Sequence, residues 1–268
     1  MSKPKAMVVL SGGQDSTTCL YWAVHQGYDV HAITFDYGQR HKIEIQAALV
    51  VASLAGLSLI QWEVVKLGQV LNGTSPLVSD APLEQYADHK SLPGGLEKTF
   101  VPMRNQLFLT IAANHAFCVG ADIVITGVCE EDFGGYPDCR REFIDRLVET
   151  INLGTFGSVS SSNERRMQIL TPLMYTTKAE SVRAALKLPG CYKALAYTHT
   201  AYDGQYPPLG HDHATLLRAK GFEEARVPDP LILRACREGL MAYPETPNYT
   251  DALIENYTEL AGMNNGHL

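Results

Sequence analysis

The sequence has no apolar run long enough to cross a membrane. None of its apolar stretches approaches the roughly 20 residues that a spanning helix needs. Residues Met1 to Lys5 lead into a short strand-like run instead of the apolar core of a signal peptide. We therefore expect a cytoplasmic protein without a membrane partner.

Basic charge and clustered cysteine are scarce as well. The 268 residues include 22 Lys and Arg against 29 Asp and Glu, a formal net charge of -7. This balance gives no basic footprint for long nucleic acid. The six cysteines are scattered, mostly inside apolar runs, which excludes a secreted disulfide framework and predicts reduced thiols.

Short β-rich apolar runs alternate with amphipathic helical patterns over the first two thirds of the chain. This alternation is typical of a parallel sheet covered by helices on both faces. The predicted strands are residues 6–10, 30–37, 59–67, 122–128 and 168–174. The predicted helices are residues 15–26, 41–55, 105–119, 138–152 and 177–185. The fold class is therefore α/β, with an open five-stranded parallel sheet.

The composition divides the chain into two parts. Residues 1–186 carry the alternating pattern and form the predicted domain, and residues 187–268 form a small C-terminal helical appendage with a helical segment near residues 230–241. Residues 68–99 contain three prolines and little regular pattern. They are interpreted as a flexible loop or a lid over a site, with a plain surface insertion as the alternative.

A phosphate cradle is predicted directly after the first strand, at residues 11–16. Two glycines let backbone N–H groups approach an anion, Ser11 and Ser16 add hydroxyl donors, and the following helix points its positive end at the charge. The carboxylate of Asp15 suits Mg2+ that bridges the phosphates. A glycine turn with a helix cap is the alternative, but a loop of six such residues after a strand favours phosphate binding.

This loop lacks the Walker pattern and the dinucleotide-binding pattern. It resembles the SGGxDS loop of the PP-loop ATP pyrophosphatases, which split ATP into AMP and pyrophosphate to activate a substrate. The resemblance implies a Rossmann-like fold of the adenine nucleotide alpha hydrolase type. Further motifs narrow it to the QueC family, and they lie at residues 10–20, 34–41, 100–105, 126–130, 135–140, 171–174 and 178–180.

The QueC resemblance implies a reaction. It converts the carboxylate of 7-carboxy-7-deazaguanine to an amide and then to a nitrile, using ATP and ammonia, in queuosine or other 7-deazapurine biosynthesis. A carboxylate is a poor electrophile, whereas its mixed anhydride with AMP has a good leaving group. Dehydration of the amide needs the same activation again.

The resemblance also implies the residues of the ATP site. Its catalytic residues are Asp15, Ser16, Arg104 and Lys178, with Mg2+ held by Asp15. The wider ATP-binding set is Leu10, Ser11, Gly12, Gly13, Gln14, Asp15, Ser16, Thr17, Thr18, Cys19, Leu20, Thr34, Phe35, Gln39, Arg104, Asn105 and Gly127. Arg104 opens an apolar helix, where an anion is favoured, and adds a permanent charge.

Three of these assignments have alternatives. Residues 34–39 contact adenine or ribose, or they form only a strand-to-helix turn. Lys178 taken alone would be a solvated helix charge. Met103 stands where the family usually has glycine, a departure that could narrow the space beside Arg104.

The substrate side of the predicted site follows the fourth strand. The implied substrate-binding residues are Glu130, Asp132, Tyr136, Pro137, Asp138 and Arg140. Carboxylates accept from a guanine-like edge, Tyr136 stacks on the base, and Arg140 pairs with the substrate carboxylate. A solvated acidic turn with an aromatic plug is the alternative. Cys139 is not expected to be a nucleophile, because adenylation needs no covalent thiol.

The sequence departs from the family at a C-terminal zinc site of four cysteines. Cys191 matches the first ligand, whereas the other three positions fall on Leu209, Asp212 and Thr215. Because leucine cannot bind zinc, the four-thiolate site cannot form. A replacement site is conceivable from Cys191, His199, His211, Asp212 and His213. We expect the tail to be fixed instead by packing or by a subunit interface, with Tyr197, Tyr202 and Tyr206 as candidates.

Loss of the zinc cysteines leaves two further functional hypotheses open. A diverged QueC-like paralogue of an antiviral operon would adenylate the deazaguanine carboxylate and conjugate it to a partner protein. A nucleotide-binding module without catalysis is the third possibility, disfavoured by the retained catalytic set. The family precedent implies a homodimer, and the chain carries no glutaminase domain that would supply ammonia.

Overall fold

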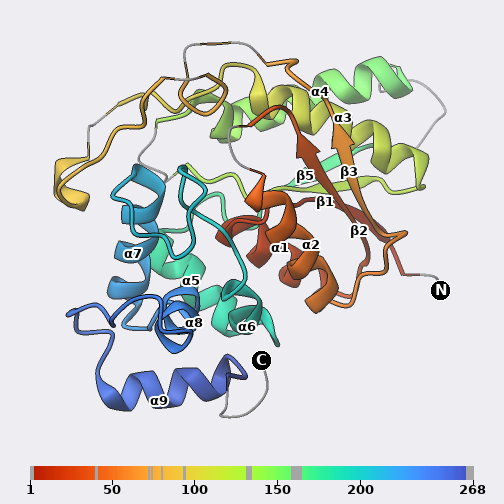
Figure 1. Cartoon of the computed structure of the whole chain (residues 1–268). Helices are drawn as coiled ribbons and strands as arrows, with labels where there is room; N and C mark the ends of the chain where they lie inside the picture. The colour runs from red at the N-terminus through yellow and green to blue at the C-terminus, as the bar shows by residue number, and fades with distance from the viewer. Residues whose placement is uncertain are drawn as a thin grey trace.

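A five-stranded, all-parallel open sheet forms the centre of the protein (Figure 1). The computed structural model describes residues 3–39, 42–71, 73, 75–79, 81–92, 95–130, 135–157 and 165–263. The strands are β1 (Lys5–Val9), β2 (Asp29–Asp36), β3 (Trp62–Lys66), β4 (Ile123–Ile125) and β5 (Gln168–Leu170). Their order is β3-β2-β1-β4-β5, and every neighbouring pair is parallel. The predicted fold class is confirmed.

The strand order reverses between β1 and β4, which places a topological switch point at the centre of the sheet. In such sheets, ligands bind beyond the carboxyl ends of the strands at that point. The helices are α1 (Gln14–His25), α2 (Ile43–Leu54), α3 (Arg104–Cys118), α4 (Arg141–Phe156), α5 (Lys178–Leu186), α6 (Cys191–Leu195), α7 (His213–Ala225), α8 (Pro230–Arg237) and α9 (Asp251–Leu260), with short 3-10 helices η1 (His89–Ser91) and η2 (Pro137–Cys139).

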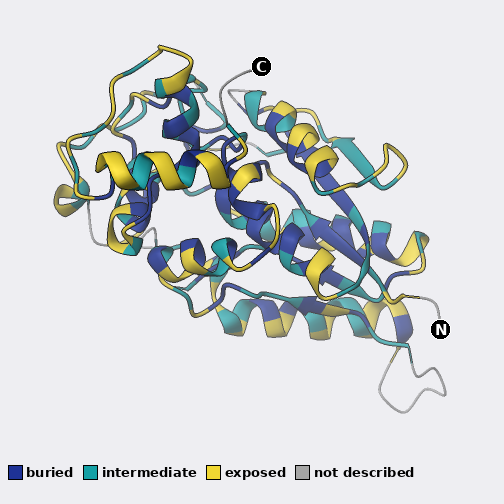
Figure 2. Ribbon diagram, turned by 90° about the horizontal axis from the view of Figure 1, so that it is seen from below, coloured by how far each residue is buried: buried dark blue, intermediate teal, exposed yellow. Residues whose placement is uncertain are grey.

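Side chains that alternate along the strands build two apolar layers. On β1, Ala6 and Val8 pack with α1 and α2, whereas Met7 packs with α3 and α4 on the opposite face. A strand with helices on both faces is apolar along its whole length, because both sets of side chains are covered. Figure 2 shows the inner strands and the inward helix faces largely buried and the outer helix faces exposed, whereas the edge strand β3 is only partly buried. Among the described residues, no helix is long and apolar enough to cross a membrane.

Three predicted strands are longer than the observed ones, and the one expected over residues 168–174 ends at Leu170. The strand expected over residues 59–67 begins only at Trp62, because Leu59 and Ile60 are 81% and 91% exposed in the turn before it. The strand expected over 122–128 ends at Ile125, since Gly127 turns to pack against the start of α1. Apolar residues next to the paired strand residues made the predicted strands too long, because a short apolar run does not reveal where strand pairing stops.

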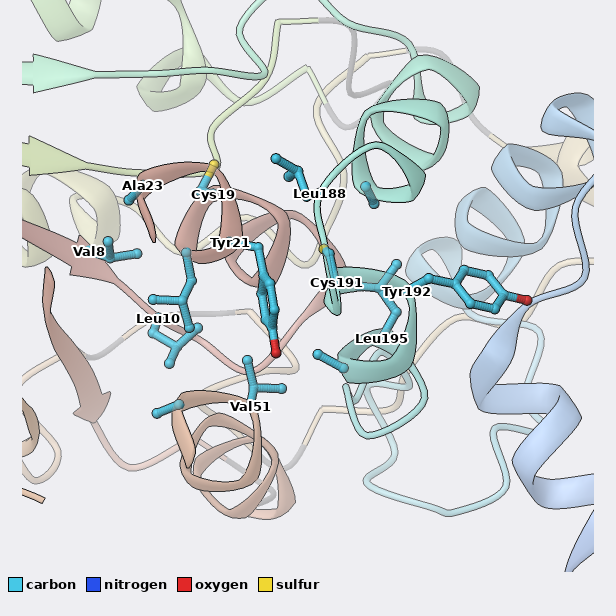
Figure 3. Close-up of a cluster of buried hydrophobic side chains, with 14 of the residues drawn as sticks. Val8, Leu10, Cys19, Tyr21, Ala23, Val51, Leu188, Cys191, Tyr192 and Leu195 are labelled. Atoms are coloured by element: carbon cyan, nitrogen blue, oxygen red, sulfur yellow. The ribbon is translucent and has the colours of Figure 1, made fainter. Parts of the chain in front are cut away.

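The C-terminal helices extend the apolar layer that covers α1 and α2. Phe222 of α7, Val227 and Ala261 belong to the same buried cluster as the residues of α1. Figure 3 shows Cys191 and Tyr192 of α6 within this cluster. The boundary between residues 186 and 187 stays a prediction, and apolar packing continues across it. The sequence pattern indicated only the helical segment near 230–241, where α8 lies.

Two tyrosines of the expected set hold the tail by stacking. The guanidinium of Arg234 lies 4.9 Å from the ring centroid of Tyr197 and 4.2 Å from that of Tyr206. Its Nε also donates to the hydroxyl of Tyr206 at 2.7 Å. A cation between two aromatic faces fixes α8 against the segment that precedes α7.

The described part of residues 68–99 lies against the segment that leads into α7. The amide of Tyr86 donates to the carbonyl of His211 at 3.0 Å, and the amide of His211 donates to Oε1 of Gln85 at 2.7 Å. Closer to the pocket, Nε2 of the buried His213 lies 3.7 Å from Oε1 of the buried Glu97. These noncovalent contacts connect the described part of residues 68–99 to the C-terminal part of the chain.

Candidate functional site

Hydrogen bonds made by its own serines fix the conformation of the loop between β1 and α1. The Ser16 hydroxyl accepts from the Ser11 amide at 3.2 Å, lies 3.0 Å from the Ser11 hydroxyl and donates to the Gly13 carbonyl at 3.1 Å. These bonds fold the loop into a cup at the amino end of α1, where the helix dipole favours an anion.

Two glycines allow the backbone to pack closely around this cup. A Cβ on Gly12, which has φ +86°, would lie 2.3 Å from the carbonyl oxygen of Glu44 in α2. A Cβ on Gly127, after β4, would lie 2.9 Å from the carbonyl carbon of Asp15. Each contact is closer than any side chain tolerates, so α2 and the β4 loop rest directly on the phosphate loop. The sequence motif therefore reflects packing as well as ligand approach.

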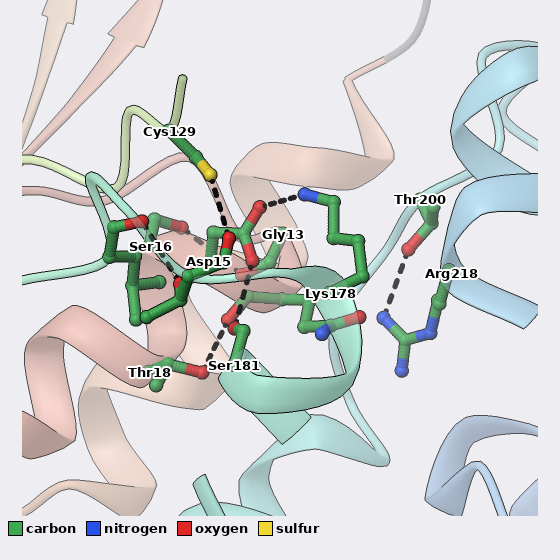
Figure 4. Close-up of polar contacts among 12 residues, drawn as sticks. Gly13, Asp15, Ser16, Thr18, Cys129, Lys178, Ser181, Thr200 and Arg218 are labelled. Atoms are coloured by element: carbon green, nitrogen blue, oxygen red, sulfur yellow. Dashed lines mark hydrogen bonds and ion pairs between the residues drawn. The ribbon is translucent and has the colours of Figure 1, made fainter. Parts of the chain in front are cut away.

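Asp15 of α1 and Lys178 of α5 form an ion pair at the mouth of the cup (Figure 4). Nζ of Lys178 lies 2.6 Å from Oδ2 of Asp15, and the Ser181 hydroxyl donates to Oδ1 at 3.3 Å. Lys178 is the first residue of α5, which Thr177 and Glu180 cap reciprocally. The fold thus brings together two residues that are far apart in the sequence, and their role in phosphate binding stays a prediction.

The amino end of α3 forms another wall. Met103, its N-cap, has φ 66° and ψ 0°, the left-handed conformation that favours glycine. Its side chain is 63% exposed and is not part of the pocket lining. The departure from glycine therefore strains the backbone. It does not narrow the cavity beside Arg104, contrary to the expectation from the sequence.

An aromatic wall follows β2. The Phe35 and Phe108 rings stack with centroids 4.3 Å apart, and Tyr37 lies 5.1 Å from Phe108. The Gln39 side chain accepts from the Tyr37 amide at 2.9 Å and donates to the Phe35 carbonyl at 3.1 Å, closing the turn. Gln39 thus shapes the turn that presents these rings, which suit a planar base.

Residues of the C-terminal part complete the site, and the sequence analysis missed them. The His199 amide donates to the Gly12 carbonyl at 2.9 Å, which ties this part to the phosphate loop. Tyr202, His213, Leu217 and Arg218 also line the pocket. Arg218 is 4% exposed and pairs with Asp229 through two bonds of 2.6 and 2.8 Å. Arg218 follows the expected zinc-cluster positions directly in the sequence, and this closeness is the one signal that could have indicated it.

One cavity of about 360 Å3 joins these walls. The predicted ATP-site residues that line it are Leu10, Ser11, Gly13, Gln14, Asp15, Ser16, Thr34, Phe35, Gln39, Arg104, Asn105, Gly127 and Lys178. Thr17, Thr18, Cys19 and Leu20 are at most 1% exposed on the core side of α1. A helix cannot present a continuous run of residues to one ligand, so the second half of the motif supports the loop from behind.

The predicted substrate residues divide into two groups. Tyr136 lines the pocket, and its hydroxyl lies 2.6 Å from that of Thr99. The carboxylates of Glu130 and Asp138 instead accept hydrogen bonds from backbone amides in the first turns of helices. The donors are the amides of Arg141 at 2.6 Å and of Asn105 at 3.2 Å. Burial raises the pKa of Asp138.

Pro137 and Arg140 are exposed and lie outside the cavity lining. Arg140 is the N-cap of α4, so its backbone is fixed by the helix start while its side chain faces solvent. Asp132 lies outside the described residues. The roles of these residues in substrate binding stay predictions.

The positions of the expected zinc cluster serve other contacts. Asp212 caps α7 by accepting from the Thr215 amide and hydroxyl, both at 3.0 Å, whereas Leu209 is 57% exposed. Cys191 lies in the apolar cluster with Cys19 and Tyr21 (Figure 3), and burial raises its pKa to about 12.

Two of the three histidines of the conceivable replacement site also make other contacts. His199 pairs through Nε2 with the carbonyl of Ala201 at 2.7 Å, and burial lowers its pKa. The side chain of His213 faces Glu97. Within the described ranges, no group of three or more His, Cys, Asp or Glu side chains is arranged to hold a metal ion.

A magnesium ion bound with a nucleotide needs less from the protein. Mg2+ keeps several waters and takes one or two carboxylates together with substrate phosphates. Asp15 is such a carboxylate, because it lines the cavity beside the loop of residues 11–16 and pairs with Lys178. The donor set therefore fits a nucleotide-bound Mg2+ without a separate metal centre.

Glu44 of α2 is an acidic group in the cavity lining that the sequence analysis did not single out. Burial raises its pKa to about 7, while the nearby charge of Arg104 opposes the shift. In the printed sequence it reads as an ordinary acidic residue in the first turn of a helix. Only the fold shows that this turn faces the site.

Comparisons with known proteins identify relatives over most of the chain. A profile of the family described as queuosine biosynthesis protein QueC matches residues 5–226. The 7-cyano-7-deazaguanine synthase of Gloeobacter violaceus is 49% identical over 229 residues, which are 85% of this chain and 95% of that protein. Proteins of the same name from Chromobacterium violaceum and Thermoplasma acidophilum are 45% and 38% identical over 88% and 86% of this chain, and over 97% and 92% of their own lengths.

Among solved structures, a predicted subunit of a tRNA methyltransferase from Methanocaldococcus jannaschii matches with 19% identity and a TM-score of 0.36. The match covers 64% of this chain and 68% of that chain. A likeness this weak does not bear on function.

Proposed function

We propose that this chain, which belongs to the queuosine biosynthesis protein QueC family and is an enzyme of that kind, converts 7-carboxy-7-deazaguanine with ATP and ammonia to 7-cyano-7-deazaguanine. The carboxylate is activated as its adenylate. The observation that carries the proposal is one cavity lined by both the phosphate loop and the Tyr136 wall. A nucleotide and a planar acid bound in this cavity meet at its centre.

The residues at the phosphate end support cleavage between the α- and β-phosphates of ATP. Pyrophosphate bound in the cup meets the amides at the start of α1 and the ammonium of Lys178, which lies 2.6 Å from Asp15. Bound Mg2+ would neutralise phosphate charge from the Asp15 side. Lys178 and the loop amides then stabilise the charge that pyrophosphate gains as it leaves.

The residues at the other end suit a planar acid. The ring of Tyr136 packs against Phe100 with centroids 5.4 Å apart and borders the cavity. Arg104 lines the cavity and carries a permanent charge near Tyr136 and Glu44. We assign it to the α-phosphate and the substrate carboxylate, whose negative charges must approach each other before the anhydride forms. The same geometry then serves the amide in the second activation.

The other hypotheses receive no support from the relatives that were found. The curated relatives carry the synthase name over nearly their full length. The retained Asp15, Arg104 and Lys178 also line the cavity together, which disfavours a module without catalysis. Homodimer formation remains a prediction from the resemblance.

Substitution at the phosphate end tests the proposal. Asp15→Ala and Lys178→Met should each lower AMP formation from ATP, Mg2+, 7-carboxy-7-deazaguanine and ammonium by at least about 100-fold, as loss of a transition-state charge contact does. Lys187→Met, at the exposed far end of α5, is the matched control and should keep wild-type activity. Chromatography measures AMP, and mass spectrometry measures the amide and nitrile. Unchanged AMP formation in Lys178→Met would remove the phosphate end from the mechanism.

A further inference from the structure

The proposed amidation needs a group that prepares its nitrogen nucleophile. At neutral pH, dissolved ammonia is mostly ammonium, which has no lone pair to attack an acyl adenylate. A carboxylate near the acyl carbon attracts the cation and accepts its proton, provided that its own pKa lies near the working pH. Neither the phosphate cup nor Lys178 can do so, because both are arranged for anions.

Glu44 lies beside the phosphate loop and near the charge of Arg104. Its backbone carbonyl rests on Gly12, where an added Cβ would approach it to 2.3 Å, so its residue borders the phosphate loop. Its side chain lines the same cavity as Arg104 and Tyr136. The acyl carbon of a bound adenylate must lie between the phosphate loop and the Tyr136 wall, because it is bonded through oxygen to the α-phosphate and directly to the purine ring.

The groups that face the Glu44 carboxylate are few. Across the described part of the chain they are Arg104 of α3, Tyr37 after β2 and Tyr202 before α7. No hydrogen bond or ion pair joins the carboxylate to a described residue, in contrast to Asp15 and Asp138. Its burial raises its pKa to about 7, so near neutral pH it exists in both the form that accepts a proton and the form that has taken one.

We propose that Glu44 forms an ammonium-binding site and acts as the proton acceptor of amidation, a role that rests on the proposed function. Its carboxylate takes one proton from ammonium, and the nitrogen lone pair forms the C–N bond. The C–O bond to AMP then breaks, and its electron pair leaves on AMP. The second proton lost from nitrogen passes to water, and Glu44 releases its own proton to water before the next cycle.

Glu44→Gln tests this role, because the amide keeps the shape of the carboxylate without its charge or basicity. Adenylation should persist, so exchange of labelled pyrophosphate into ATP should stay within about threefold of wild type. Amide formation from ammonium at pH 7 should fall by about 100-fold, within the range of general base catalysis. The KM for ammonium should rise, whereas the KM for 7-carboxy-7-deazaguanine should not change.

Hydroxylamine separates proton removal from a structural role. It is neutral at pH 7 and needs no deprotonation before attack, so Glu44→Gln should form the hydroxamate within about threefold of the wild-type rate. Glu44→Asp should recover part of the ammonium-dependent rate. Glu142→Gln is the matched control, since Glu142 lies in the first turn of α4 as Glu44 does in α2.

Two results would overturn the assignment. One is an equal fall with ammonium and hydroxylamine, which would show that Glu44 positions the substrates without accepting a proton. The other is undiminished amide formation in Glu44→Gln. If wild-type protein forms neither adenylate nor amide, the proposed function itself is wrong, and that outcome is separate from any difference between variants.

Discussion

Removing the Arg218 guanidinium should destabilise the C-terminal helices strongly. Arg218 of α7 donates to Asp229 at 2.6 and 2.8 Å, to the hydroxyls of Thr198 and Thr200 at 2.8 and 2.9 Å, and to the carbonyl of Leu195 at 3.2 Å. The two charged side chains are only 4% and 5% exposed. Arg218→Met leaves the Asp229 charge buried without its main partner.

The expected cost follows from this burial. Breaking a buried ion pair by removing one partner costs about 3–5 kcal/mol. For a chain of this size, each kcal/mol lowers Tm by roughly 2–4 °C, so Tm should fall by about 6–20 °C. The double variant Arg218→Met with Asp229→Asn should lose less than the sum of the single losses, because it leaves no unpaired charge.

Urea denaturation followed by circular dichroism measures the loss, and a second charge on α7 provides the control. Lys220 pairs with Glu224 at 3.7 Å near the surface, so Lys220→Met should cost less than about 1 kcal/mol. If Arg218→Met lowers the free energy of unfolding no more than Lys220→Met does, the buried ion pair does not stabilise the C-terminal helices. The segment that follows the expected zinc positions would then be fixed by contacts other than this buried pair.

Three further predictions concern the backbone and charge of the site. Gly12→Ala should be inactive, and its free energy of unfolding in urea should fall by about 2–4 kcal/mol. Gly27→Ala is the control, because Gly27 has φ +84° and nothing lies within 4 Å of its added Cβ, and it should lose only about 1–2 kcal/mol. Equal losses would contradict the contact with α2. Met103→Gly should raise the free energy of unfolding by about 0.5–1 kcal/mol by relieving a positive φ, and a lower Tm would argue against strain there. Because burial raises the pKa of Glu44 from 4.5 to about 7, Glu44→Gln should be more stable than wild type by about 3 kcal/mol at pH 8, at roughly 1.4 kcal/mol for each pKa unit. That gain should vanish as the pH falls from about 7 towards the unfolded pKa of roughly 4.5; a gain independent of pH would contradict a buried charge as its cause.

The sheet could be predicted because its physical signal is local. Strands buried on both faces are apolar throughout, and helices between them show a period near 3.6 residues. Strand ends were less predictable, because Leu59 and Ile60 are apolar although 81% and 91% exposed. Of the C-terminal helices, α7 carries His213 and Arg218 among its pocket residues and Gly221 against α5, which interrupt a helical apolar pattern.

The site was predicted in its phosphate half and less in the rest. A glycine-rich loop after a strand has a sequence signature, whereas Glu44, Tyr202 and Arg218 reach the cavity only through the fold. Glu130 and Asp138 look like ligands in sequence, yet their carboxylates accept helix amides. Sequence reasoning identifies residue types that can bind a ligand, but the packing of helices decides which of them face it.

Carboxylate adenylation in this cavity is the central claim, and transfer of oxygen tests it directly. Purified protein is incubated with ATP, Mg2+, ammonium and 7-carboxy-7-deazaguanine that carries 18O in its carboxylate, and the products are analysed by mass spectrometry. If the carboxylate is adenylated, each AMP formed gains a single 18O atom from the carboxylate, and the nitrile appears. Unlabelled AMP, or 18O recovered in inorganic phosphate together with ADP, would contradict it.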